Sequence, residues 1–155
     1  MQQNKSAVII ICSVLFLAGC DTLSKLQNVW LDSVTLVMDQ DANNDSATSI
    51  DLVFFLKQDL MDKVAKMTAF EYYNSVEQLV KDNPKMIQIV RWELAPGQSK
   101  LDEKIEGIEG SPLGAIVFAS YTSPGDHRVI LGLQHDIIIT LKANDFIITE
   151  KEAKE

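Results

Sequence analysis

Segments in which apolar and polar residues alternate recur along most of the chain, and they restrict the folds that it can adopt. Val34, Leu36 and Met38 occupy every second position of one such segment, and Ile50 and Leu52 begin another. Successive side chains of a strand point to opposite faces, so a period of two predicts β-strands with one buried face. About eight short strands are expected, over residues 33–39, 49–57, 87–94, 101–105, 114–121, 128–133, 136–141 and 145–149.

One segment between the second and third expected strands has a helical period. Thr68 and Glu71 match a capping box, and Asn83-Pro84 predicts the end of the helix. Apolar residues at helical spacing lie between these signals: Ala69, Tyr72, Tyr73, Val76, Leu79 and Val80. A further helical turn is expected over residues 60–66. Turn signals such as Pro96-Gly97 separate the later strands. The pattern predicts a mainly β fold, a two-sheet β-sandwich of about eight strands with a helical insertion.

The N-terminus has the features of a secretory signal peptide. Lys5 precedes an apolar run that ends at Ala18, and a run of about a dozen residues is too short to span a bilayer, which needs roughly 20. Leu17-Ala18-Gly19-Cys20 places small residues before a cysteine, as at a lipoprotein cleavage site. We expect cleavage before Cys20 and covalent lipid on that residue. Because Cys12 is removed with the leader, no disulfide and no other cofactor are expected.

Length and charge limit the organisation and the partners. We expect a signal peptide over residues 1–19, a lipidated tether over 20–31, one sandwich domain over 32–150 and a charged tail over 151–155. The net charge is −8 and no basic cluster interrupts the acidic surface. Such a surface repels phosphate backbones, which argues against nucleic-acid binding.

No catalytic residue is expected. A hydrolase needs a nucleophile, a base and an orienting group, and neither His127 nor His135 is accompanied by a nucleophile motif. We interpret both as ordinary loop histidines. The acidic residues Asp102, Glu103, Glu106 and Glu109 are interpreted as a solvated edge, and Tyr72, Tyr73 and Trp92 as core. No pair of His or Cys residues has the spacing of zinc ligands.

A polar stretch joins the first two expected strands and is too long for a tight hairpin turn. Asp39, Asp41 and Asn43 match positions 1, 3 and 5 of an EF-hand calcium loop. However, Asn44 stands where that loop needs glycine and Ile50 where it needs a bidentate glutamate, so no metal is expected. An exposed polar loop carried on rigid strands is suited to contact another molecule.

The order of these segments resembles the TssJ (SciN-type) lipoproteins of the type VI secretion system. The resemblance runs from Cys20 to about Thr149. It is carried by the lipoprotein cleavage site, the first two strands, the Asp- and Asn-rich loop between them, the helix that opens on Thr68-Ala69-Phe70-Glu71 and the strand over 113–121. The string Leu94-Ala95-Pro96-Gly97-Gln98 is the most typical of the family.

This resemblance implies a transthyretin-like sandwich without catalytic activity, which tethers a trans-envelope complex to the outer membrane. The implied partner is the periplasmic domain of TssM, with TssL in the wider complex, and no small-molecule substrate. In the family the loop between the first two strands contacts TssM. It maps here onto Gln40, Asp41, Ala42, Asn43, Asn44, Asp45, Ser46, Ala47 and Thr48.

Two questions stay open from the sequence. Asp21 follows the lipidated cysteine, and an aspartate there is the usual inner-membrane retention signal in enterobacteria, although the outer membrane is favoured here. The same features also fit a different envelope binding module, such as a secretin pilot or a cell-wall-associated lipoprotein. A lipid-anchored hydrolase or glycan-binding enzyme would instead need a concave pocket lined by carboxylates or a histidine.

Overall fold

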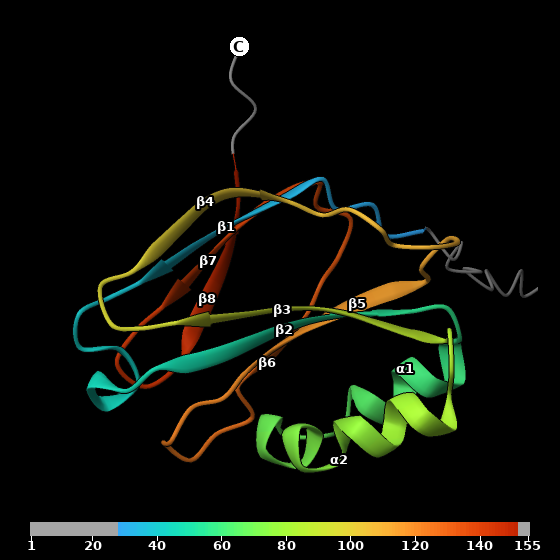
Figure 1. Cartoon of the computed structure of the whole chain (residues 1–155), viewed down its shortest axis with the longest axis horizontal. Helices are drawn as coiled ribbons and strands as arrows, with labels where there is room; N and C mark the ends of the chain where they lie inside the picture. Colours follow the sequence, from blue (N-terminus) through green and yellow to red (C-terminus); the bar gives the residue numbers. More distant parts are fainter. Residues whose placement is uncertain (1–27, 152–155) are drawn as a thin grey trace, which may run out of the picture.

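The computed structural model describes residues 28–151 and consists of two packed β-sheets with two helices on the outer side of one sheet (Figure 1). The strands are β1 (Ser33–Met38), β2 (Thr48–Phe55), β3 (Ile87–Leu94), β4 (Ser99–Lys104), β5 (Gly114–Ala119), β6 (Arg128–Ile130), β7 (Asp136–Leu141) and β8 (Phe146–Glu150). The helices are α1 (Gln58–Val64) and α2 (Ala69–Asp82), and a short 3-10 turn, η1 (Ala42–Asp45), lies between β1 and β2. The expected eight-stranded, two-sheet sandwich with a helical insertion is confirmed.

The strand order explains the long connection after β1. Sheet A has the order β4-β1-β7-β8 and sheet B the order β3-β2-β5-β6, so β1 and β2 belong to different sheets. Their connection crosses from one layer to the other and cannot be a hairpin turn. Within sheet A, β1 pairs with β7 in parallel, whereas every other strand pairing is antiparallel.

Sheet B is covered on both faces. In β2, Ile50, Leu52 and Phe54 point into the core between the sheets, as their spacing predicts. Val53 and Phe55 point the other way and pack under the helices in a second apolar cluster. The period of two therefore identifies the inner face correctly, but the outer face of β2 is also buried because α1 and α2 lie over it.

A buried charged residue lies between sheet B and the helices. Asp51 on β2 is fully buried, and Arg91 on β3 binds its carboxylate through Nε at 2.6 Å and Nη2 at 2.5 Å. The hydroxyl of Tyr72 on α2 donates to the same carboxylate at 2.8 Å. Burial and then the charge of Asp51 raise the pKa of Tyr72 well above its usual range, so the hydroxyl remains a donor. These three side chains fix α2 to sheet B.

The predicted capping box opens α2. Oγ1 of Thr68 accepts a hydrogen bond from the backbone N–H of Glu71 at 3.2 Å, and the Glu71 carboxylate accepts one from the backbone N–H of Thr68 at 2.8 Å. Asn83 caps the other end, through its side-chain amide on the carbonyl of Leu79 at 2.9 Å. The expected further turn over 60–66 is α1, which begins earlier, at Gln58.

The core includes two residues of the segment that the sequence assigns to the tether. Val29 and Leu31 are buried in the core between the sheets, although Trp30 between them is 58% exposed. Because the side chains of Val29 and Leu31 pack in the core, this segment belongs to the edge of the sandwich. The signal peptide, Cys20, the tether up to residue 27 and the tail from residue 152 lie outside the described residues. No helix within the described range is long and apolar enough to cross a bilayer.

The two ends of the sandwich differ. At one, which we call the entry end, the backbone N–H of Val29 donates to the carbonyl of Pro112 at 3.0 Å, and that of Asp32 to the carbonyl of His135 at 2.6 Å. From there β1 runs to the opposite end, where the β1–β2 connection begins (Figure 1). The six residues of β1, at about 3.3 Å each, separate the two ends by roughly 20 Å.

Candidate functional site

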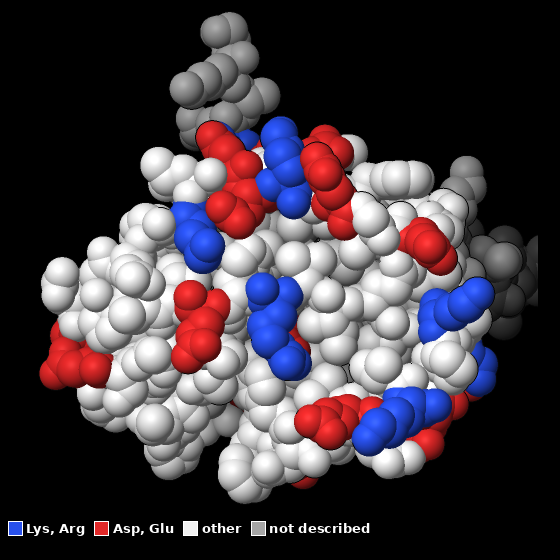
Figure 2. All heavy atoms as spheres, viewed as in Figure 1, with Lys and Arg blue, Asp and Glu red and all other residues white. Residues whose placement is uncertain are grey.

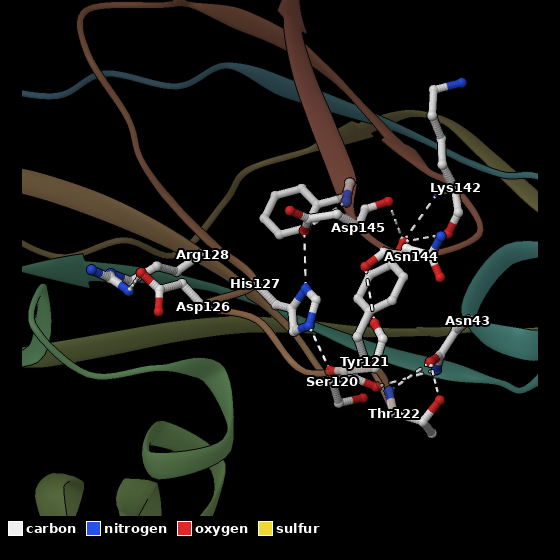
Figure 3. A network of polar contacts seen from close by, with 12 residues as sticks. Asn43, Ser120, Tyr121, Thr122, Asp126, His127, Arg128, Lys142, Asn144 and Asp145 are labelled. Carbon is white, nitrogen blue, oxygen red and sulfur yellow. Dashed lines mark hydrogen bonds and ion pairs between the residues drawn. The ribbon is translucent and has the colours of Figure 1, made fainter.

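Four connections between strands meet at the end of the sandwich opposite the entry end, which we call the loop end. They are the segments 39–47 between β1 and β2, 95–98 between β3 and β4, 120–127 between β5 and β6, and 142–145 between β7 and β8. Figure 3 shows side chains of the first, third and fourth segments directed toward one another. The predicted partner loop is therefore one part of a connected surface.

The β1–β2 loop turns back through a run of left-handed backbone. Asn43, Asn44 and Asp45 have φ angles of 50°, 52° and 57°. Asn and Asp enter this region more readily than other L-residues because their short polar side chains bond locally. The concentration of Asn and Asp in the loop thus has a conformational cause, in addition to any role in binding.

Asn43 is the centre of the polar network in Figure 3 and is only 1% exposed. Its Nδ2 donates to Oγ1 of Thr48 at 2.9 Å and to the carbonyl of Ser120 at 3.2 Å. Its Oδ1 accepts from the backbone N–H of Thr122 at 2.7 Å. Its backbone N–H donates to the carbonyl of Ala143 at 3.1 Å. The side chain and the backbone of this one residue together join three of the four connections.

The nine residues predicted to contact a partner fall into two groups. Ala42, Asn43 and Thr48 are buried and hold the loop in place. The exposed residues are Gln40, Asp41, Asn44, Asp45 and Ala47, with Ser46 partly exposed. Contact with a partner stays a prediction, and it applies to the exposed group, because buried side chains cannot reach another molecule.

The Pro-Gly turn supports the loop from the β3–β4 side. Gly97 has a φ of +77°, and its backbone N–H donates to the carbonyl of Met38 at 3.0 Å. The Gln40 side chain lies so close that a Cβ added to Gly97 would stand 2.2 Å from its Nε2. Glycine is favoured here by its backbone angle, and a larger residue would also displace the Gln40 side chain.

His127 is not the ordinary loop histidine that the sequence predicts, because it is buried at 5% exposure. Its ring stacks on Tyr121 with centroids 4.8 Å apart. Nδ1 lies 3.1 Å from Oδ1 of Asp145, and Nε2 lies 2.8 Å from the carbonyl oxygen of Ser123. Both ring nitrogens are thus engaged by the chain itself, so the imidazole joins the β5–β6 and β7–β8 connections. Sequence spacing carries no sign of this, since 18 positions separate His127 from Asp145.

The remaining histidine and the acidic residues considered in the sequence analysis do not lie together in one site. His135 is exposed and 3.9 Å from Asp32, at the entry end. Asp102 contacts Lys151 and Thr35, and the Lys151 ammonium holds the pKa of Asp102 below its usual range. Among residues 28–151, no three His, Cys, Asp or Glu side chains are grouped as metal ligands would be.

A small cavity lies at the entry end, with a volume of about 200 Å³. It is lined by Val29, Trp30, Leu31, Asp32, Phe54, Ile105, Gly107, Ile108, Gly110 and Pro112. Asp32 is the one carboxylate among these residues, and the volume is below the roughly 300 Å³ at which small-molecule sites begin. This cavity does not have the lining that the enzymatic alternative requires.

Charges of opposite sign lie next to each other over the surface. Figure 2 shows Lys and Arg interspersed with Asp and Glu on one face. At the loop end, Lys142 lies 3.5 Å from Asp39, and Arg128 lies 2.7 Å from Asp126. Such exposed pairs contribute little to stability but orient the side chains.

Comparison with known proteins identifies the architecture. No protein-family model and no curated protein sequence matches the chain. Among solved structures, the type VI secretion lipoprotein TssJ1 from Pseudomonas aeruginosa is 15% identical over 83% of this chain and 100% of its own, with a TM-score of 0.56. Lip from Serratia marcescens, a membrane-bound component of the type VI secretion system, is 14% identical over 79% and 97%, with a TM-score of 0.58. A chain of a type VI membrane complex is 18% identical over 77% and 98%, with a TM-score of 0.50.

Proposed function

Because the chain has the fold of the TssJ-type lipoproteins, we propose that it tethers the membrane complex of a type VI secretion system to the outer membrane. In this function, lipid on Cys20 holds one end of the protein at the membrane. The exposed residues of the β1–β2 loop bind the periplasmic domain of TssM, and TssL completes the complex. The protein contributes binding and no catalysis.

The observation that carries the proposal is the placement of the β1–β2 loop opposite the entry end. The described chain enters beside Pro112 and His135, and the loop lies at the far end of β1. A tether needs two attachment points that do not obstruct each other. A rigid sandwich with the anchor approaching one end and a presented loop at the other meets this requirement.

The loop is also prepared for binding. Buried Asn43 and the Gly97 turn fix its backbone, so few degrees of freedom are lost when a partner binds. Nine residue-to-residue steps separate Cys20 from Val29, and an extended chain of this length reaches at most about 32 Å. The sandwich therefore stays close to the membrane that holds Cys20.

The loop assignment is tested with a triple variant that keeps the backbone: Asp41→Ala, Asn44→Gly and Asp45→Gly. Glycine preserves the left-handed angles at the last two positions. We expect the variant to unfold as the unaltered protein does and to lose at least about tenfold in affinity for the TssM periplasmic domain, measured by isothermal titration calorimetry. The matched control, Glu106→Ala with Glu109→Ala, alters exposed acidic residues on another loop. Equal affinity of all three proteins would refute the assignment.

The anchor is tested separately. A Cys20→Ala variant should bind the TssM domain in solution with unchanged affinity but leave the membrane fraction and fail to retain the complex there. Lipid anchoring requires two or more acyl chains to be stable, so loss of the acceptor residue removes it. Recovery of the variant in the membrane fraction without TssM would contradict the anchor.

Outer-membrane placement is part of the proposal, and Asp21 is the residue that argues against it. Density-gradient separation of the two membranes should place the protein in the outer-membrane fraction. An Asp21→Ser variant should remain there. Inner-membrane recovery of the unaltered protein, with a shift to the outer membrane on Asp21→Ser, would show that the aspartate retains it.

A further inference from the structure

The loop end presents polar groups almost exclusively. Its exposed side chains in the β1–β2, β5–β6 and β7–β8 connections are Gln40, Asp41, Asn44, Asp45, Ala47, Thr122, Pro124, Asp126, Lys142, Asn144 and Asp145. Protein interfaces have a polar rim but derive most of their affinity from a few buried aromatic, arginine or aliphatic side chains. These three connections provide a polar rim but no apolar centre.

Phe70 supplies an apolar group at this end. It is 77% exposed, the highest exposure among the large apolar side chains of residues 28–151. It is the second residue of α2, and the preceding Ala69 donates its backbone N–H to the carbonyl of Asp126 at 2.8 Å. Figure 1 shows the first turn of α2 beside the β5–β6 connection.

Hydrogen bonds connect the first turn of α2, which carries Phe70, to the predicted partner loop. Asp126 precedes His127, whose Nε2 lies 2.8 Å from the carbonyl of Ser123. Thr122 immediately precedes Ser123. Its hydroxyl accepts a hydrogen bond from the Asn44 side-chain amide at 3.1 Å, and its backbone N–H donates to Oδ1 of Asn43. The first turn of α2, the β5–β6 connection and the β1–β2 loop thus form one linked surface.

Folding does not account for an aromatic side chain at this position. The residues of α2 that pack on sheet B are Ala69, Tyr72, Val76 and Leu79, and Phe70 points away from them. Phenylalanine is also a weaker helix former than alanine or leucine. The capping box at Thr68 fixes the backbone of this turn, so little conformational entropy is lost when Phe70 is buried by a partner.

We propose that Phe70 is the apolar anchor of the partner-binding surface, and that it inserts into an apolar pocket of the TssM periplasmic domain. This inference rests on the proposed function and extends the binding site beyond the β1–β2 loop. Asp41 and Asp45 have no ion-pair partner among the described residues, whereas Asp126 is already paired with Arg128 at 2.7 Å. The matching surface therefore carries cations around its apolar pocket.

The test compares Phe70→Ala with Leu101→Ala. Leu101 is a suitable control because it is 70% exposed and lies on β4 in sheet A, whereas Phe70 lies on α2, which covers sheet B. Titration calorimetry with the TssM periplasmic domain should show affinity reduced at least about tenfold by Phe70→Ala and changed less than about twofold by Leu101→Ala. Phe70→Trp, which keeps an aromatic side chain, should retain more affinity than Phe70→Ala. The urea midpoints of all variants should agree with that of the unaltered protein.

The outcomes separate this inference from the proposed function. If Phe70→Ala binds as tightly as the unaltered protein while the triple loop variant loses affinity, the anchor is rejected and the proposed function stands. If the unaltered protein does not bind the TssM domain, the proposed function itself fails. Equal losses for Phe70→Ala and Leu101→Ala would show a nonspecific effect and also reject the anchor.

Discussion

Oδ1 of Asn43 accepts hydrogen bonds from both the backbone N–H and the hydroxyl of Thr122, at 2.7 Å and 3.0 Å. The two residues are 79 positions apart, in the β1–β2 and β5–β6 connections. Neither connection can change conformation without breaking a buried polar contact. The loop end is therefore a single rigid surface, and the candidate binding residues are held in a fixed relation to one another.

We predict that Asn43→Gly destabilises the protein by about 2 kcal/mol. The substitution removes buried hydrogen bonds, each worth about 1 kcal/mol, while glycine retains the left-handed backbone angle. Asn44→Gly is the matched control, since Asn44 has nearly the same φ but an exposed side chain. Its effect should stay within about 0.5 kcal/mol. Urea unfolding measures both, and equal effects would show that Asn43 is not the centre of the network.

A second pair of variants isolates the contact between Gly97 and Gln40. Gly97→Ala and Gly107→Ala both place alanine at a positive φ, which costs about 1–2 kcal/mol in each case. Only the alanine at position 97 meets another side chain, because nothing lies within 4 Å of a Cβ at Gly107. We expect similar thermal destabilisation but a shift of the Gln40 side-chain amide resonance in Gly97→Ala alone. An unchanged Gln40 resonance would contradict the contact.

Removal of Arg91 should strongly destabilise the sandwich. Arg91→Met leaves the fully buried carboxylate of Asp51 with only the Tyr72 hydroxyl, and because Arg91 itself is half-exposed we expect a cost of about 2 kcal/mol, below that of breaking a fully buried pair. Lys81→Met, which removes an exposed cation from α2, should cost less than about 0.5 kcal/mol. Adding Asp51→Asn to Arg91→Met should recover part of the loss. A double variant less stable than Arg91→Met would refute the unpaired charge as the cause.

Acid should weaken the start of α2. The backbone N–H and then the hydroxyl of Thr68 bond to the Glu71 carboxylate and lower its pKa below the usual value of 4.5. A carboxyl whose pKa is lower in the folded state stabilises that state above its unfolded pKa, and the contribution disappears as pH falls through the lowered value. The stability difference between the unaltered protein and Glu71→Gln should therefore shrink below about pH 4.5.

Carbon-13 NMR of the Glu71 carboxyl carbon, together with the Thr68 amide proton, follows this titration directly. Both signals should titrate together, with a midpoint below 4.5. A Glu71 midpoint at or above that value would show that the carboxylate does not hold the cap in solution. Because α2 begins with this cap, loss of the cap would also loosen the backbone next to Phe70.

Patterns among residues close in the sequence were sufficient to predict the strands and helices of the fold. The alternation around Val34 and Ile50 predicts strands, and Thr68 with Glu71 predicts the helix start, because these signals depend on backbone geometry within a few residues. The Asn and Asp residues between β1 and β2 likewise identify an irregular polar loop. The sequence by itself therefore determined which segments are strands, helices and connections.

Only the tertiary structure decided what those segments contact. Parallel pairing of β1 with β7, burial of the outer face of β2 and the inclusion of Val29 in the core depend on residues distant in the chain. The same is true of the loop end, where Asn43 is buried beside Asp45, which is exposed. Sequence spacing cannot separate these two neighbours, because burial is decided by groups such as Thr122 that pack against the loop from other strands.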